Sequence, residues 1–335
     1  MKTMRLHAKW LGAILVIALS VCPLGIKAQD RSDAPTEETV ANLAAGRVVI
    51  AVVKDAFIVG TIENPIEAET RPPVPVEITG SRLGVILGAV EWTSPSTQQE
   101  IARLDQELPH LRSRSIPSQP HLGDTVGGDE AIDIEAIGQG LLERLNDIAK
   151  NLHGKIGLPA NEPLAELIIA DYIPTYGAEV WQLAYGIKQQ LEQNDYWTTR
   201  VLRPSYLQFW PPEKGQPRTL VEFAYPPESA PPTLLELLRQ KDPRLEKIRA
   251  SDPKMAEVAA HFLQETSDKA LAADAIQFLR AALDAIAPPN ARETMAIIRQ
   301  ETGFEWILAP PPEPVHPGQK PPRPPDAPTL VKPPQ

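Results

Sequence analysis

Residues 47–62 read RVVIAVVKDAFIVGTI, and this stretch decides the fold. Two runs of β-branched and apolar residues flank Lys54-Asp55, a pair that favours a tight turn, so the stretch predicts an antiparallel hairpin. A second hairpin is predicted from residues 74–79 and 82–92, which flank Gly80-Ser81. Because residues 83–90 are almost continuously apolar, we expect their strand to be covered on both faces.

Helices are predicted after these hairpins, where the apolar period changes from two to three or four. The first covers residues 94–108, with Ile101, Leu104 and Leu108 on one face. After a polar loop at 109–128, a second helix is predicted for residues 129–152, with an apolar stripe of Ile134, Ile137, Leu141, Leu145 and Ile148. Acidic residues crowd its first turns, where the helix dipole favours anions. We therefore prefer capping to a metal site for Asp129, Glu130, Asp133 and Glu135.

The second half of the chain repeats this order of strands and helices. Strands are predicted at residues 163–172, 178–185, 197–203, 206–210 and 219–225. Helices are predicted at 233–250, at 253–266 behind the N-cap Asp252, and at 268–287 behind the N-cap Ser267. Residues 293–299 and 304–308 read as a closing hairpin, although Asn290 and Glu293 also fit the capping box of a helix.

The N-terminus predicts export. Residues 1–28 combine basic residues, an apolar run from Leu11 to Ile26 and the ending Ile26-Lys27-Ala28, as a cleavable signal peptide does. The run is shorter than the roughly 20 residues that span a bilayer, so cleavage is preferred to a retained membrane anchor. No membrane span is expected after cleavage. The mature protein should be periplasmic or extracellular, and residues 29–45 form a lead segment before the first hairpin.

Charge and cysteine content exclude several classes of protein. The signal removes four basic residues and the only cysteine, Cys22, leaving 29 basic against 43 acidic residues and a net charge of −14. A surface this acidic repels nucleic acid.

The C-terminal segment is rich in proline. Residues 309–335 hold 12 prolines in 27 positions, which predicts a disordered, polyproline-like tail outside the folded domain.

The order of hairpins and helices resembles the proteasome-subunit branch of the N-terminal-nucleophile hydrolases. Residues 52–59 look like that family's first hairpin, 82–88 like its fourth strand, 262–283 like its late helix pair, and 295–304 like its closing strands. The resemblance covers residues 46–308, with an insertion at about 211–252. It implies an α+β fold: a four-layer αββα sandwich with two antiparallel sheets.

The family's chemistry requires a threonine, serine or cysteine at the start of the first strand, because its free α-amine acts as the general base. Here that position falls at Ala45-Gly46-Arg47, where there is no hydroxyl or thiol. Glu63 stands loosely for the family's acid, and nothing stands for its lysine, since Lys54 lies in the first turn. Self-cleavage before Thr61 would cut the second strand, and Thr39 lies upstream of the first. We therefore assign no catalytic residue.

Other sites are weakly indicated. Phosphate-loop, dinucleotide-binding and zinc-protease motifs are missing from the sequence, and the histidines lack ligand spacing, so no cofactor and no metal are predicted. His110, Arg112, Arg114 and His121 gather in the loop at 109–128, where a solvated loop is preferred to an anion site. Aromatic side chains concentrate near residues 196–210, for which core packing is preferred to a sugar or peptide platform: Tyr196, Trp197, Tyr206, Phe209 and Trp210.

Three classes of function remain. The preferred one is an exported, non-catalytic protein on a hydrolase-like scaffold, acting by assembly or partner binding. Its expected partner is a second copy of the chain or a protein of the cell envelope. The alternatives are an exported hydrolase or peptidase with an unrecognised nucleophile, and a cell-envelope polysaccharide-binding module that uses the aromatic side chains.

The secreted protein should begin at Gln29 and contain no cysteine, because signal peptidase cleaves after the small residue Ala28. Intact mass measurement of the exported form tests this. A retained Met1, or an acyl group on Cys22, would contradict the prediction.

Overall fold

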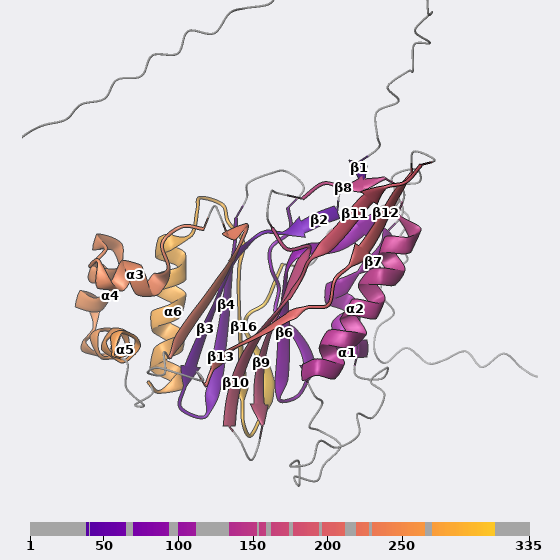
Figure 1. Cartoon of the computed structure of the whole chain (residues 1–335). Helices are drawn as coiled ribbons and strands as arrows, with labels where there is room; N and C mark the ends of the chain where they lie inside the picture. Colours follow the sequence, from indigo (N-terminus) through magenta and orange to yellow (C-terminus); the bar gives the residue numbers. More distant parts are fainter. Residues whose placement is uncertain are drawn as a thin grey trace, which may run out of the picture. The chain divides into compact units, whose positions relative to one another are not determined.

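The computed structural model describes residues 38–39, 41–64, 70–93, 100–111, 134–152, 154–158, 162–173, 177–193, 196–211, 219–227, 230–264 and 270–311. The predicted signal peptide and most of the proline-rich tail lie outside these residues. So do Asp129, Glu130, Asp133 and Ser267, and all of the loop at 109–128 except its first three positions. The described part contains two main antiparallel sheets and six helices, so the predicted α+β class is confirmed (Figure 1).

The first main sheet has five strands in the order β14-β3-β4-β15-β16. Its members are β3 (Gly46–Val53), β4 (Ala56–Glu63), β14 (Leu220–Tyr225), β15 (Glu293–Arg299) and β16 (Gly303–Leu308). The hairpin predicted from residues 47–62 is confirmed as β3 and β4, whose turn places Asp55 at a φ of 60°. The closing hairpin is confirmed as β15 and β16, which excludes the helix that Asn290 and Glu293 would have capped.

The second main sheet has seven strands, with β13-β10-β9-β6-β2 in order and with β5 and β7 also paired to β6. Its members are β2 (Ala41–Ala44), β5 (Val76–Thr79), β6 (Arg82–Thr93), β7 (Glu100–Arg103), β9 (Ala165–Ile173), β10 (Gly177–Tyr185) and β13 (Ser205–Trp210). Every residue of β6 except the last is buried, as its apolar sequence predicts. The lead segment contributes β2, which the sequence analysis did not predict to be a strand.

Two small sheets lie beside these. β1 (Glu38–Thr39) pairs with β8 (Lys155–Ile156) in parallel, and β11 (Ile187–Leu191) pairs with β12 (Trp197–Val201) in antiparallel orientation. Of these strands only β12 was predicted. The others are very short or mostly polar, so they carry little hydrophobic alternation.

The helices fall into two groups. α1 (Leu104–Leu111) and α2 (Ile134–Asn151) pack against the seven-stranded sheet. The five-stranded sheet is covered by α3 (Leu234–Arg239), α4 (Pro243–Ser251), α5 (Pro253–Leu263) and α6 (Ala272–Ile286). Figure 1 shows the two groups on opposite sides of the strands. Among the described helices, none has the length and apolar character needed to cross a membrane.

The prediction of one helix across residues 94–108 is wrong in its middle. Residues 100–103 instead form β7, which pairs with the last residues of β6, and the helix begins only at Leu104. β6 is 12 residues long and presents backbone groups to this segment. Pairing with them outweighs the weak local preference for helix.

The helix predicted across residues 233–250 is two helices. Pro243 lacks the backbone N–H that a continuous helix requires, so α3 stops and α4 begins behind the N-cap Asp242. The N-cap Asp252 of α5 is confirmed, and its side chain accepts from the Lys254 N–H at 2.8 Å. The predicted start of the next helix is wrong, because α6 begins at Ala272 with Leu271 as its N-cap.

Three apolar clusters form the core. One joins the seven-stranded sheet to α1 and α2, and a second joins the five-stranded sheet to the remaining helices. The third contains strand residues of both main sheets, among them Val48, Leu87 and Ile168, and no helical residue. The sheets also touch through their turns. Gly303 has a φ of 76°, and a Cβ there would lie 2.7 Å from the Gly80 carbonyl oxygen.

Candidate functional site

The start of β3 is where the resembled hydrolases carry their nucleophile, and here the chain passes through it without a break. Ala44 ends β2 in the seven-stranded sheet and Gly46 begins β3 in the five-stranded sheet. Between them, the Ala45 N–H donates to the Arg71 carbonyl at 3.2 Å, and the Ala45 carbonyl accepts from the Asn64 N–H at 3.0 Å. The nitrogen of Gly46 is thus an amide inside the sheet structure, without the basicity of a terminal amine.

The backbone at Gly46 also excludes a side chain. Gly46 has a φ of 156°, and a Cβ on it would lie 2.2 Å from the carbonyl oxygen of Ile62 in the neighbouring strand. No carbon atom fits at that distance from a backbone oxygen. In this conformation, the threonine, serine or cysteine that the family chemistry needs cannot be placed here.

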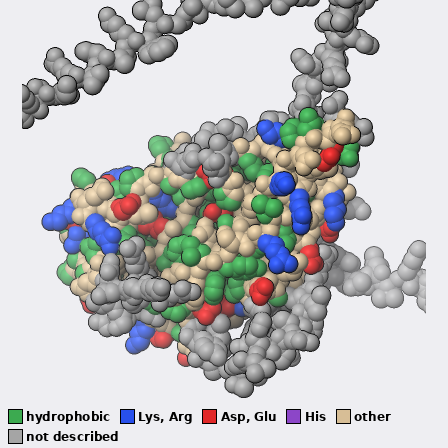
Figure 2. Space-filling view, viewed as in Figure 1, with side chains coloured by type: hydrophobic (Ala, Val, Ile, Leu, Met, Phe, Trp, Pro, Cys, Tyr) green, Lys and Arg blue, Asp and Glu red, His purple; other side chains and the backbone are tan. Residues whose placement is uncertain are grey.

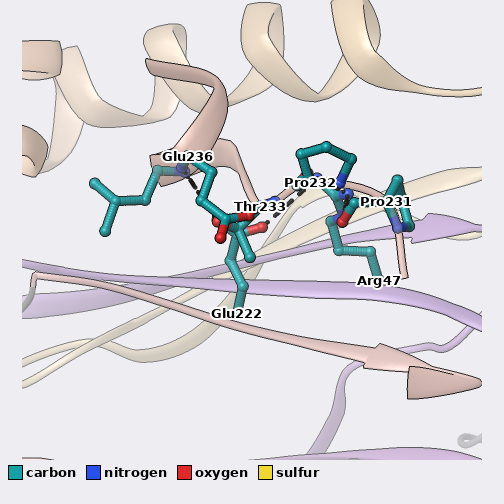
Figure 3. A network of polar contacts seen from close by, with 7 residues as sticks. Arg47, Glu222, Pro231, Pro232, Thr233 and Glu236 are labelled. Carbon is teal, nitrogen blue, oxygen red and sulfur yellow. Dashed lines mark hydrogen bonds and ion pairs between the residues drawn. The ribbon is translucent and has the colours of Figure 1, made fainter. Parts of the chain in front are cut away.

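Arg47 points toward Pro231 and Pro232, in the segment that leads into α3 (Figure 3). Its Nη2 donates to the carbonyl oxygens of Pro231 and Pro232 at 3.1 and 2.8 Å, and its Nη1 lies 3.6 Å from Glu222 Oε2. Burial lowers the pKa of Arg47, an effect that the charges of Glu222 and Glu236 oppose. Two carbonyls and one carboxylate thus hold this guanidinium.

The same network holds the N-terminus of α3. Glu222 of β14 accepts from the Leu235 N–H at 3.2 Å, and burial raises the pKa of this carboxyl. Thr233 and Glu236 form a capping box, in which the Thr233 N–H donates to Glu236 Oε2 at 2.8 Å and the Glu236 N–H donates to Thr233 Oγ1 at 3.1 Å. Arg47, Glu222 and the capping box together join two strands to a helix (Figure 3).

The other sequence candidates are engaged in structural contacts or lie far from Gly46. Glu63 accepts from Arg292 Nε at 2.8 Å and from Arg292 Nη2 at 2.6 Å. Thr61 is fully buried, and its hydroxyl lies 2.7 Å from the Thr294 hydroxyl. Lys54 is exposed in the turn at the other end of β3. Thr39 lies in β1.

Two carboxyl groups that were not predicted from the sequence as site residues, Glu162 and Glu166, lie close enough to Tyr225 of β14 to affect its pKa. Tyr225 is the register partner of Gly46, and its hydroxyl donates to the Pro163 carbonyl at 3.3 Å. Burial raises the pKa of Glu166, a hydrogen bond with Gln182 opposes this, and the charge of Glu162 adds to it. Burial and the charges of Glu162 and Glu166 also raise the pKa of Tyr225. These groups occupy one region but lack a nucleophile with a base beside it.

The aromatic residues near 196–210 do not form one platform. Trp210 is buried, and Phe209 packs edge-to-face on Phe223 with ring centroids 4.8 Å apart. Tyr196 and Tyr206 are 53% and 40% exposed. The prediction of core packing is therefore confirmed for Phe209 and Trp210. The exposed Tyr206 lies on β13, and the exposed Tyr196 lies just before β12.

The described residues contain no metal site, and one of their pockets lies far from Gly46. Within the described residues, no group of three or more histidine, cysteine, aspartate or glutamate side chains is placed to hold a metal ion. A pocket of about 350 Å³ lies between the turns at Thr79–Ser81 and Gln300–Gly303. It is at the opposite strand ends from Gly46, since the Gln300 N–H donates to the carbonyl of Asp55 in the β3–β4 turn.

Comparison with known proteins gives no relative: no family model matches the chain, and no curated protein matches its sequence.

Replacing Gly46 by alanine should lower the free energy of unfolding by about 1–3 kcal/mol, because the added methyl group overlaps the Ile62 carbonyl. Urea unfolding of the mature protein measures the change. Gly80→Ala is the matched control, since nothing lies within 4 Å of a Cβ at Gly80. Equal stability of the two variants would contradict the steric account of Gly46.

Glu166→Gln should stabilise the fold at neutral pH. The raised pKa means that the folded state favours the protonated carboxyl, so ionisation costs stability as the pH rises through the unfolded value of 4.5 and then through the folded one. The variant should have a higher melting temperature than wild type near pH 7.5. The difference should vanish near pH 3.5, where the Glu166 carboxyl is neutral in both the folded and the unfolded state. Glu77→Gln, at an exposed position in β5, is the control and should leave the melting temperature unchanged at both pH values. A difference that is independent of pH would contradict the prediction.

Proposed function

We propose that this protein is an exported, non-catalytic protein on a scaffold like that of the N-terminal-nucleophile hydrolases, and that it acts by binding a protein partner. The predicted signal at residues 1–28 supports export to the periplasm or beyond. The scaffold we propose is a four-layer αββα sandwich over residues 46–308.

The composition of the three apolar clusters supports this layering. A sandwich of two sheets between two helical layers needs one core made only of strand residues and two cores that each join one sheet to helices. The cluster of Val48, Leu87 and Ile168 has the first composition, and the two helix-containing clusters have the second. Alternation along β3 agrees, because Val48, Ile50 and Val52 belong to the strand-only cluster while Val49 and Ala51 contact helices.

The observation that carries the non-catalytic proposal is the incorporation of residues 41–44 into the seven-stranded sheet. In the family chemistry, the residues before the nucleophile must be removed to free its amine. Here they are β2, in register with β6 from Ala41 opposite Trp92 to Ala44 opposite Gly88, and Ala41 and Ala44 are buried. Cleavage before Gly46 would remove a strand and would leave glycine, which has no nucleophilic side chain, as the new terminus.

Covalent labelling tests the proposal against the hydrolase alternative. The mature protein is incubated with a hydroxyl-directed covalent probe and with fluorogenic peptides, and the expected results are unchanged intact mass and no turnover above that of buffer. Thr61 is the hydroxyl to examine, since self-cleavage at Gly60-Thr61 would expose it. Thr61→Ala and Thr294→Ala form a matched pair, because each removes one side of the same hydroxyl contact.

Turnover that is lost in Thr61→Ala and kept in Thr294→Ala would overturn the proposal, as would an adduct on Thr39 or Thr61. Turnover that is lost in both variants would also overturn the non-catalytic proposal but would not identify Thr61 as the nucleophile, and circular dichroism would show whether the variants fold.

A further inference from the structure

Large exposed apolar side chains are concentrated in one segment. Of the six such residues in the described part of the chain, all but Leu271 lie between residues 191 and 207: Leu191, Tyr196, Leu202, Tyr206 and Leu207. They belong to the β11–β12 hairpin, its connections, and β13. Exposed apolar side chains that lie together on a folded protein mark a surface that another molecule can cover.

The hairpin extends the β10–β13 pair beyond the main sheet. β10 leads through Gly186 into β11, β12 leads through residues 202–204 into β13, and the Leu202 N–H donates to the Gly186 carbonyl at 2.8 Å. One face packs on α2, where Val201 is buried and its N–H donates to Asn146 Oδ1 at 3.0 Å. Because side chains alternate along a strand, the other face is presented to solvent.

Cations line that outer face. Lys188 and Arg200 are exposed and stand directly opposite each other in the β11–β12 register, and Arg203 is exposed just beyond. Figure 2 shows lysine and arginine side chains gathered over the part of the molecule where β11 and β12 lie. None of the three forms an ion pair with a described residue. Like charges directly opposite each other on a sheet destabilise it, and an anion placed between them offsets that repulsion.

β13 adds an edge. It is the terminal strand of the seven-stranded sheet and pairs only with β10 among the described strands. A terminal strand leaves alternate backbone N–H and carbonyl groups on its outer side, where another extended chain can pair with them. Proteins commonly protect such edges with charged side chains, but here the exposed residues are apolar: Leu207 is exposed on one face of β13, and its neighbour Tyr206 lies on the other face, toward Gly138 of α2.

We propose that β13 and the β11–β12 hairpin form a docking site for an acidic, extended segment of a partner protein, which adds as a strand to β13 and places its carboxylates on Lys188, Arg200 and Arg203. This inference rests on the proposed partner-binding function and names the chemistry of the partner. The mature chain has a net charge of −14, so a basic face on it is complementary to an acidic partner. The open strand edge favours a polypeptide over a lipid or glycan surface, since neither supplies a matching row of backbone groups.

Fluorescence anisotropy with synthetic peptides tests the proposal. The probe is a mixture of eight-residue peptides that alternate glutamate with valine, isoleucine, leucine or tyrosine; a second mixture has lysine in place of glutamate. The acidic mixture should bind the mature protein at low salt and the basic mixture should not. Lys188→Glu/Arg200→Glu should weaken binding by about ten-fold or more. Lys54→Glu/Lys247→Glu changes two exposed cations outside the patch by the same total charge and should leave the affinity unchanged.

Strand addition is tested separately with acidic peptides N-methylated at every second residue. Methylation removes the donors along one edge of the peptide, so these peptides should bind more weakly than their parents. Equal affinity of parent and methylated peptides would overturn strand addition. Equal weakening by the patch variant and the control variant would overturn the placement of the site.

Other occupants give distinct results. Sedimentation that shows a dimer lost in Lys188→Glu/Arg200→Glu, without peptide binding, would overturn the proposal in favour of a second copy of the chain. Binding to phosphatidylglycerol vesicles without peptide binding would overturn it in favour of a lipid surface. Mass spectrometry of the recovered peptide separates the two proposals: a cleaved peptide refutes the non-catalytic function, whereas an intact peptide that never bound refutes the docking site alone.

Discussion

The backbone crossing at Gly46 is the constraint on which both main sheets depend. There the chain leaves β2 of one sheet and enters β3 of the other, and a Cβ would come within 2.2 Å of the Ile62 carbonyl. Glu63 and Tyr225 are the register partners of Gly46 in the strands on either side. Their side chains are in turn held by Arg292 and by the Pro163 carbonyl. One residue without a side chain therefore sets the relation between a strand of one sheet and three strands of the other.

Buried charges reinforce this frame. Arg47 and Glu222 join β3 and β14 to the N-terminus of α3, and Arg82 of β6 donates through Nε to Asp171 of β9 at 2.8 Å. Burial raises the pKa of Asp171 although Arg82 opposes the shift, which indicates that desolvation is large at this pair. Breaking such a pair costs about 3–5 kcal/mol, because the remaining charge is buried without compensation. These groups are held by their partners and join separate elements of the fold.

These two features together support the proposal of a hydrolase-like scaffold without hydrolase chemistry. A fold does not imply an activity, because activity depends on particular side chains in a particular geometry. In this chain, the position that would carry the family's nucleophile has no side chain. Five of the six large exposed apolar side chains of the described residues, and the exposed cations Lys188 and Arg200, lie on β11, β12, β13 or the segments that join them. We therefore place the proposed recognition of another chain at the edge strand β13 and the adjoining β11–β12 hairpin.

Local sequence determined the elements whose partners are adjacent in the chain. The hairpins β3–β4, β5–β6 and β15–β16 were predictable, because a turn such as Lys54-Asp55 places neighbouring runs together without reference to anything distant. The absence of a nucleophile at Gly46 was likewise readable, since it concerns residue type alone. β7 and β2 were not predictable, because each is a strand only through pairing with β6. The contacts of Arg47 with Pro231, Pro232 and Glu222 join residues about 180 positions apart. Only the tertiary structure decided such contacts, because a strand register or a buried ion pair is a property of two distant segments and is encoded in neither one alone.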